Sequence, residues 1–572
     1  MKRTLVSLLC SVLLSSLPVY AASLPDAGLI LREQQQPTQR LPDSLPKPDE
    51  STTERPPLTD SGIKVAIKGF RFTGITGMTG EIELQELLKN AIGKEQGLAD
   101  LQRLAGLVTD YLRGKGFFLA RAYLPKQDVT SGFIEIAVIG GRVDAGTTIR
   151  AKEPRRIRDG ILKGMVDGGI KSGEALHEKQ LERSLMLLND LPGITSRGTL
   201  ERGKEYGSTK VLIDVEEGPI ASGGISADNF GNRYTGTWRG TGYATANDPL
   251  GIGDQLNLSL TGAEGLFQGR VGYTAQLHPR GLKGSISYTG MYYELGKELE
   301  NLNAYGRADT IGVNLSYPIL RSRALSLWKN LSYEYRTMSD YANGALTRSR
   351  DIHSGTADLT ASSYDGLAGG GLTNIRIAIT AGDVALGVSD DAYTDAITAK
   401  SAGCYYKFGY SVARLQRLIG NLSLFASASG QLAGSNLDSS EKFILGGSSG
   451  VRSYPVGEAS GDEGHSFTTE LRYDVPTKGK WGTPQLVGFI DTGNITLHKD
   501  VWTNSISSAT GKNNYWLSGG GLGVNLSKSG LYALRASWAH TIGDNPGRST
   551  TGKNADNYSE ENRFWFQTSI WF

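Results

Sequence analysis

Apolar and polar residues alternate along most of residues 219–572. In the stretch QLNLSL, Leu256, Leu258 and Leu260 fall on one face of an extended chain, and Gln, Asn and Ser fall on the other. Gly, Asn and Asp separate such stretches, and the sequence shows no helical periodicity here. A period of two with turn residues between the segments predicts a series of β-strands that are apolar on one side only.

This series of strands predicts a transmembrane antiparallel β-barrel. At about 22 residues per strand and loop it allows about 16 strands, within the range of bacterial outer-membrane barrels. A soluble sandwich would also alternate, but its polar face would point outward. The polar face here is rich in Ser, Thr, Asn and Gly, which suits a water-filled lumen. Beyond residue 21 we find no apolar run of about 18 residues, so a membrane helix is not expected and a closed barrel remains.

The last ten residues, RFWFQTSIWF, end the series on an aromatic side chain. Their apolar positions share one face of the predicted strand: Phe564, Phe566, Ile570 and Phe572. A terminal strand of this kind resembles the targeting signal of bacterial outer-membrane barrels. We therefore expect these four residues to direct insertion into the outer membrane.

Two α+β units precede the barrel. Residues 63–143 show a strand pattern at 64–72, helical patterns at 80–93 and 98–116, and strand patterns at 117–125 and 132–141. Residues 144–219 repeat the order strand, helix, helix, strand, strand. A repeated order of elements at a spacing of about 75–80 residues predicts two copies of one structural unit.

The first 62 residues contain three different patterns. Residues 1–21 combine a basic start, a short apolar core and small residues at the end, which predicts a secretory signal peptide. Residues 22–40 include a short polar helical pattern at about 26–36. Residues 41–62 are rich in Pro, Asp, Glu, Ser and Thr, which predicts an extended or disordered linker.

Composition and motifs give no support for catalysis, metal binding or nucleic-acid binding. The net charge is +2, from 60 basic and 58 acidic residues, so a basic nucleic-acid face is not indicated. We expect no metal, no cofactor and no catalytic residue. The glycine clusters lie among strands and do not open helices, as a phosphate loop would. A hydrolase that used His540 would need a serine partner, and no motif singles one out. The histidines lack metal-ligand spacing; they are His177, His278, His353, His465, His498 and His540.

The whole order of segments resembles that of the TpsB transporters of two-partner secretion. Three further stretches match that family: LNDLPG at 188–193, DNFGNRYTG at 228–236 and NDPLGIGDQL at 247–256. The resemblance implies that 63–143 and 144–219 are POTRA domains and that 220–572 is a sixteen-stranded barrel. It also implies that the helix within 22–40 plugs the pore.

In this family a long loop folds back into the barrel and carries a Val-Arg-Gly-Tyr/Phe motif, whose arginine pairs with the aspartate of a Phe-x-Asp-x-Gly strand. Residues 443–464 are a Gly- and Ser-rich stretch that predicts such a loop. A guanidinium–carboxylate pair in a lumen of reduced dielectric would fix the loop. Ser453 replaces the usual glycine, and serine disfavours positive φ. The matching residues are Val451, Arg452, Ser453 and Tyr454 on the loop, and Phe489, Asp491 and Gly493 on the strand.

The resemblance implies an outer-membrane protein with its POTRA domains in the periplasm, which secretes one large unfolded exoprotein of the TpsA type. Outer-membrane lipid and the barrel assembly machinery would be its other partners. Tyr111, Arg121 and Tyr123 are candidate client-binding residues, or equally residues that support the fold. Two alternatives stay open: a POTRA-barrel assembly factor that inserts other outer-membrane proteins, and a diffusion porin without a client.

Overall fold

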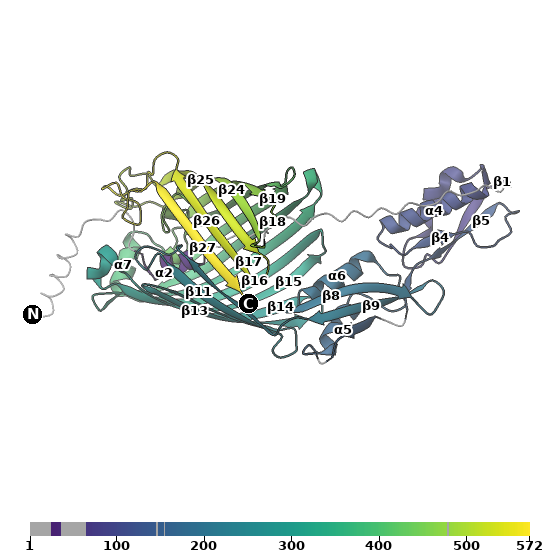
Figure 1. The fold of residues 1–572 in the computed structure, drawn as a ribbon, viewed down its shortest axis with the longest axis horizontal. Coiled ribbons are helices and arrows are strands. Elements are labelled where there is room, and N and C mark those ends of the chain that lie inside the picture. The colour runs from purple at the N-terminus through teal and green to yellow at the C-terminus, as the bar shows by residue number, and fades with distance from the viewer. Residues whose placement is uncertain (1–24, 36–63, 145–146, 154, 478–479) are drawn as a thin grey trace, which may run out of the picture.

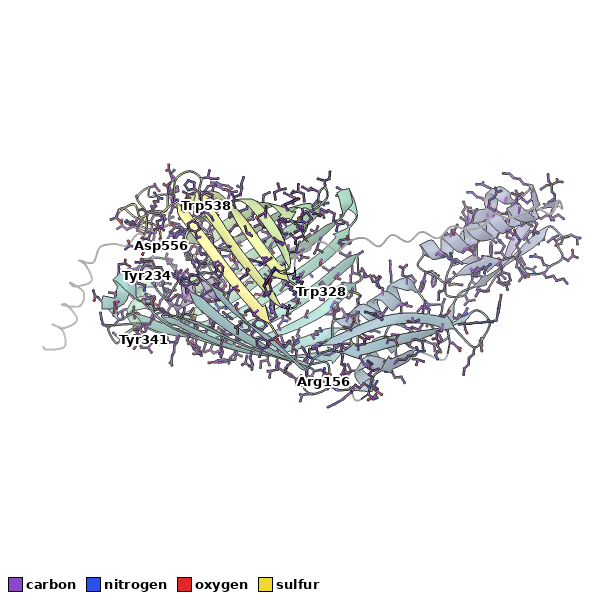
Figure 2. All side chains as sticks on the ribbon, viewed as in Figure 1. Arg156, Tyr234, Trp328, Tyr341, Trp538 and Asp556 are labelled. Atoms are coloured by element: carbon purple, nitrogen blue, oxygen red, sulfur yellow. The ribbon has the colours of Figure 1, made fainter. Side chains whose placement is uncertain are left out.

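The computed structural model describes residues 25–35, 64–144, 147–153, 155–477 and 480–572. The predicted signal peptide (1–21) and linker (41–62) lie outside these residues. The described chain forms a barrel with two α+β units projecting from one end (Figure 1). Arg156 and Trp328 lie toward that end, and Tyr341 lies toward the opposite one (Figure 2).

Sixteen antiparallel strands close the barrel, as predicted. The first strand, β10, pairs with the last, β27, through residues such as Ile225 opposite Ile570. The strands are β10 (Ala221–Asp228), β11 (Arg239–Asn247), β12 (Gln255–Ala263), β13 (Leu266–His278), β14 (Leu282–Glu294), β15 (Tyr305–Arg321), β16 (Leu325–Ala342), β17 (Ala345–Asp365), β18 (Gly371–Leu386), β19 (Gly403–Arg417), β20 (Leu422–Ala433), β23 (Glu463–Asp474), β24 (Thr483–Thr496), β25 (Asn514–Lys528), β26 (Tyr532–Thr541) and β27 (Asn562–Trp571).

Side chains alternate across the barrel wall. Leu258 and Leu260 on β12 are exposed on the outside, and Leu256 is half-buried on the same face. Three of the four predicted targeting residues lie on β27 and the fourth, Phe572, follows it directly; all four are exposed, whereas Trp565 points inward and is buried. An outward apolar set and an inward polar set are what a lipid exterior and a wet lumen require.

The connections at the barrel end that faces the α+β units are short, and the long connections all lie at the other end. The longer connections contain the helices η2 (Lys297–Leu302) and α7 (Ser389–Ile397), and η3 (Leu367–Gly369) occupies one of the short ones. The connection between β20 and β23 is the longest. It contains η4 (Ser439–Glu441) and a two-stranded sheet of β21 (Phe443–Ile444) and β22 (Ser460–Gly461). The predicted loop at 443–464 therefore has short strands at its base, and its last two residues begin β23.

Helix α2 (Ala27–Gln34) lies inside the barrel (Figure 1). Ala27, Ile30 and Leu31 recur at helical spacing and are buried. They pack against apolar side chains of the wall and of the longer connections, among them Tyr234, Tyr293, Met338 and Ile352. The short helix predicted at about 26–36 is therefore present.

The first unit contains β1 (Lys64–Ala66), β2 (Gly69–Thr73), α3 (Glu81–Leu88), η1 (Lys89–Ala91), β3 (Glu95–Gly97), α4 (Leu98–Gly114), β4 (Arg121–Tyr123) and β5 (Phe133–Ile139). Its sheet has the order β2-β5-β4. The single strand predicted at 64–72 is split in two, because β1 pairs with β3 and β2 pairs with β5.

The second unit contains β6 (Arg142–Val143), β7 (Thr148–Ala151), α5 (Asp159–Asp167), α6 (Glu178–Asn189), β8 (Ile194–Arg202) and β9 (Ser208–Glu217). β9 is the central strand, with β8 on one side and β6 and β7 on the other. β6 ends the range predicted for the first unit, yet its pairing places it in the second sheet. The order strand, helix, helix, strand, strand recurs in both units.

Candidate functional site

The barrel lumen contains a cavity of about 670 Å³. Its lining comes from strands around the wall, from helix α2 and from the inward loop, and it is rich in Ser, Thr, Arg and Glu side chains. Arg32 and Glu33 of the helix and Arg452 of the loop all border it. The polar lining suits an extended polypeptide in water better than an apolar ligand.

At the tip of the inward loop, Arg452 makes a two-pronged contact with Asp491 on β24. Its Nε lies 2.8 Å from Oδ2 and its Nη2 lies 2.9 Å from Oδ1. Its Nη1 lies 2.8 Å from Glu470 Oε1 on β23, and its guanidinium stacks 3.5 Å from the ring centroid of Phe489. Asp491 is fully buried and also accepts a hydrogen bond from Thr468. This arrangement satisfies a buried carboxylate with charge-assisted hydrogen bonds.

The remaining motif residues pack the loop tip into the wall. Val451 and Tyr454 are fully buried in an apolar cluster with side chains of β24 and β25. Ser453 is fully buried too, and its φ is not positive, so the serine adopts an ordinary backbone conformation. Gly493 leaves room for the side chain of Leu445. The indole Nε1 of Trp565 donates a 2.7 Å hydrogen bond to the Arg452 carbonyl.

Two partners of Arg452 were not predicted from the sequence. Glu470 and Trp565 belong to no linear motif. Alternation along β23 and β27 places both on the inward face, but it does not say which inward residues the loop will contact. We refer to Arg452, Asp491, Glu470 and Trp565 as the loop-tip cluster.

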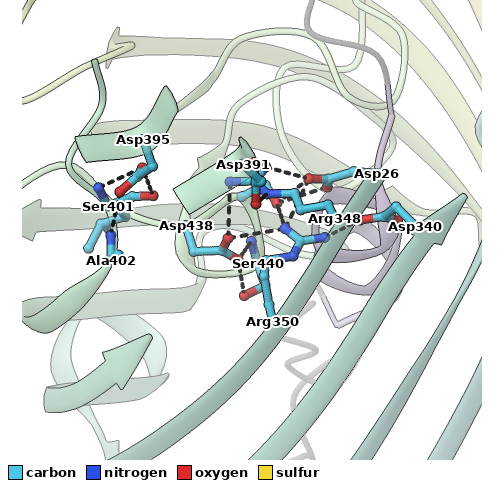
Figure 3. Close-up of polar contacts among 12 residues, drawn as sticks. Asp26, Asp340, Arg348, Arg350, Asp391, Asp395, Ser401, Ala402, Asp438 and Ser440 are labelled. Carbon is cyan, nitrogen blue, oxygen red and sulfur yellow. Dashed lines mark hydrogen bonds and ion pairs between the residues drawn. The ribbon is translucent and has the colours of Figure 1, made fainter. Parts of the chain in front are cut away.

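A second polar cluster holds the start of helix α2 (Figure 3). Asp26 caps the helix by accepting a 2.8 Å hydrogen bond from the Leu29 backbone. Its carboxylate also lies 3.0 Å from Arg350 and 3.3 Å from Arg348, both on β17. Arg350 is fully buried and pairs with Asp340 at 2.6 Å and Asp438 at 3.0 Å. We call Arg348, Arg350, Asp340, Asp391 and Asp438 the helix seat.

Different parts of the chain meet in this seat. Asp391 comes from α7 and lies 3.2 Å from the Nε of Arg348. The Ser439 hydroxyl, on η4 in the β20–β23 connection that carries the inward loop, donates to Asp26 at 2.8 Å. The Ala27 backbone donates to Asp340 at 2.8 Å. The helix therefore touches both the barrel wall and the inward loop.

The end of helix α2 is also held by polar contacts. Glu33 accepts a 3.0 Å hydrogen bond from Asn232 in the β10–β11 connection. Gln34 accepts from Arg239 at 2.7 Å, and Arg32 donates to the Lys442 carbonyl at 2.9 Å. The helix is thus fixed at both ends.

The sheets of both α+β units have outer strands with an open edge, and β4 and β8 are two of them. Among the described residues, β4 pairs only with β5, and β8 pairs only with β9. Arg121 is exposed on β4, and Tyr123 is half-buried at its end. An unpaired edge offers backbone donors and acceptors to another extended chain.

Tyr111, on α4, is half-buried, and its side chain contacts residues of its own unit. Its hydroxyl donates to Glu83 at 2.5 Å, and Lys115 forms an ion pair with the same carboxylate. Hydrogen bonds from Lys115, then Tyr111 and Thr79, lower the pKa of Glu83 to about 2. These contacts link α3 to α4 and favour a fold-supporting role for Tyr111 over a direct client contact.

The second unit docks on the barrel through the end of α6. Asp190 caps that helix and accepts from Arg321 on β15 at 2.8 and 2.6 Å. Lys283 on β14 donates to the Asp190 carbonyl at 2.5 Å. Arg183 on α6 donates to the Pro318 carbonyl at 2.8 Å. Asp190 lies within the LNDLPG stretch, so this stretch forms the joint between the unit and the barrel.

Two kinds of feature are absent from the described part of the chain. None of its helices is both long and apolar enough to cross a membrane. None of its His, Cys, Asp and Glu side chains gather in a group of three or more that could hold a metal ion.

A sixteen-stranded barrel with a helix and an inward loop in its lumen and α+β units at one end defines the class of outer-membrane transporters with POTRA domains. The comparison with known families agrees. Residues 207–526 match the model of the haemolysin secretion/activation protein ShlB/FhaC/HecB, and residues 65–141 match that of the POTRA domain, ShlB-type. The chain belongs to this family, the TpsB transporters of two-partner secretion. Its barrel lies in the outer membrane and its POTRA domain in the periplasm.

The chain is also similar to individual proteins. The heme/hemopexin transporter protein HuxB of Haemophilus influenzae is 27% identical over 559 residues, which cover 96% of this chain and 95% of HuxB. The solved structure of CdiB from Escherichia coli matches with a TM-score of 0.72 at 19% identity and covers 96% of both chains. BamA from Haemophilus ducreyi lacking POTRA domains 1–3 matches with a TM-score of 0.50 at 14% identity, over 88% of this chain and all of that one. The two structural likenesses concern the fold alone.

Proposed function

We propose that this protein secretes one large exoprotein of the TpsA type in unfolded form, from the periplasm to the cell surface. The observation that carries the proposal is helix α2 inside a polar lumen, in a member of a secretion family. The wide polar lumen is the path for the client, and the helix closes this path at rest.

The contacts of helix α2 support a removable plug. The helix has eight residues, too few to be stable in isolation. Its ends are held by ion pairs and hydrogen bonds that water can replace when the helix leaves. The seat has four carboxylates around two guanidinium groups once Asp26 is counted, so Asp26 is held against some like-charge repulsion.

The loop-tip cluster is proposed to hold the inward loop at a fixed depth while the client passes. Loss of either member of the Arg452–Asp491 pair would leave a buried charge without its partner, which costs about 3–5 kcal/mol. The loop would then leave its place against the wall. We assign the cluster this positioning role and no chemical one.

The client is proposed to bind in the periplasm by adding a strand to an open edge of the α+β units. β4 and β8 have such edges, and both lie beside the second helix of their unit. We interpret the second unit as another POTRA domain on the basis of the repeated element order. Backbone hydrogen bonds would supply affinity, and side chains such as Arg121 and Tyr123 would supply selectivity. Since no nucleotide site is expected from the sequence, folding of the client outside would drive transport.

A photo-crosslinking amino acid at position 123 tests the client-binding step. In cells that also make the large exported protein encoded beside this one, it should crosslink to that client. The same amino acid at Tyr206, an exposed tyrosine between β8 and β9, is the matched control. Equal crosslinking at both positions would rule out selective capture at β4. Crosslinks to other outer-membrane barrels in place of the client would favour an assembly factor.

A further inference from the structure

Consecutive residues of the loop tip dock on a pair of neighbouring positions in the wall. Asp491 on β24 lies directly opposite Gly519 on β25 in the strand register. Arg452 pairs with Asp491, and the next residue, Ser453, lies against Gly519. The Ser453 hydroxyl is 3.5 Å from the carbonyl of Ser518. The wall partner in this second contact, Gly519, belongs to neither of the two linear motifs.

Gly519 faces the lumen and leaves space that Ser453 fills. A Cβ at position 519 would overlap the Ser453 hydroxyl and lie only 2.5 Å from the Ser453 Cβ. A rotation of the hydroxyl would not relieve the clash with the Cβ. The overlap therefore has to move the loop tip or the wall strand, and close-packed interiors resist both.

We propose that Gly519 is a positioning residue for the inward loop and that Ser453 and Gly519 form a size-matched pair. Where the TpsB family usually has a glycine in the loop motif, this chain has a serine, and the bare backbone of Gly519 receives its side chain. The pair sets the depth of the loop tip together with the Arg452–Asp491 contact. The effect of the pair on secretion rests on the proposed function, whereas its effect on the loop position does not.

Four variants test the pair: Gly519→Ala, Ser453→Gly, and Gly519→Ala combined with either Ser453→Gly or Ser453→Ala. Gly520→Ala is the matched control, because that position faces outward and its nearest neighbours lie at 3.4 Å, an ordinary contact. Barrel insertion is followed by heat-dependent gel migration. The loop position is followed in purified protein by tryptic cleavage after Arg452, which is buried when the tip is docked.

We expect Gly519→Ala to increase cleavage after Arg452 by about tenfold and to lower client release similarly. Ser453→Gly should restore both in the double variant, whereas Ser453→Ala should not, because it keeps the clashing Cβ. Cleavage and release unchanged in Gly519→Ala would overturn the proposal. The double variant must also recover what Gly519→Ala loses. If Ser453→Gly does not restore the loop position, or does not restore barrel insertion where Gly519→Ala prevents it, the proposal is wrong. If wild-type protein releases no client, the proposed function fails, and the cleavage pattern still decides on the pair.

Discussion

Arg452 holds the inward loop through its whole guanidinium group. Two nitrogens face Asp491, the third faces Glu470, and the flat face stacks on Phe489. A lysine has a single cationic nitrogen and cannot make these contacts together. The site therefore depends on the shape of the arginine and not only on its charge.

Arg452→Lys should lower client release by about tenfold, because the loss of one charge-assisted hydrogen bond costs about 1.5–3 kcal/mol. Asp491→Asn should have a similar effect, and the double variant should be no worse than either single one. Release is measured as client in the medium relative to client in the cell. Arg323→Lys, on an exposed turn, is the control. If Arg452→Lys releases as much client as the wild-type protein, a positive charge alone is enough to hold the loop.

Glu83 gives the first unit a defined dependence on pH. Its pKa is lowered to about 2 in the folded state from an ordinary value of 4.5. Its contribution to stability is therefore present above about pH 4.5 and is lost as the pH falls toward 2. Glu83→Gln should speed hydrogen exchange in α3 and α4 relative to wild type at pH 7. At pH 2 the two proteins should exchange alike, and a difference that persists there would contradict this assignment.

Some contacts could be predicted residue by residue and others could not. Arg452 and Asp491 lie in short motifs that the family resemblance pairs, so their contact could be predicted. In the helix seat, Asp340 and Arg350 lie on neighbouring strands of one hairpin, whereas Asp26 and Asp438 come from distant parts of the chain and meet Arg350 only in the folded barrel. The sequence does show that Arg348 and Arg350 share one face of a strand, because they are two residues apart. The sequence did not say that this face would meet the helix.

Among the elements, helix α2 connects the wall to the inward loop. Its first turn contacts β16 and β17, and Asp26 also accepts from Ser439 on η4. The helix itself could be predicted from its polar pattern and its spacing, but its place in the lumen came only from the family resemblance. Likewise, alternation predicted the strands of the barrel, while the break between β1 and β2 depends on partners far along the chain.

Asp26→Ala should loosen the helix and open the pore more often. Loss of the ion pairs to Arg348 and Arg350, together with the helix cap, should increase the open probability by about tenfold in planar-bilayer recordings. Asp390→Ala is the matched control, because this exposed aspartate on α7 lies next to the seat residue Asp391. Unchanged conductance in Asp26→Ala, with the barrel correctly inserted, would argue against a plug.

At the scale of the whole molecule, the joint between the second unit and the barrel decides where the open edges point. Arg321 and Asp190 form the main charged contact of this joint. Asp190 caps the C-terminal end of α6, which packs on β8. The joint therefore fixes the position of β8, with its open edge, relative to the barrel.

Asp190→Arg and Arg321→Asp should each broaden the distance distribution between spin labels on the second unit and on the barrel. Each should also lower client release, by about fivefold for a partly buried ion pair. The combined swap should recover part of both effects, because the opposite charges meet again. If the combined swap and the single variants give the same distance distribution, other contacts set the orientation of the second unit on the barrel.

We expect this chain to move an unfolded exoprotein through its lumen without another protein. This can be measured with the purified protein in liposomes with the α+β units outside, to which unfolded client is added without nucleotide. The client should become protected from external protease with the wild-type protein and not with Arg452→Ala. A client that stays accessible to protease while the inserted barrel conducts ions would show that the protein does not move it unaided.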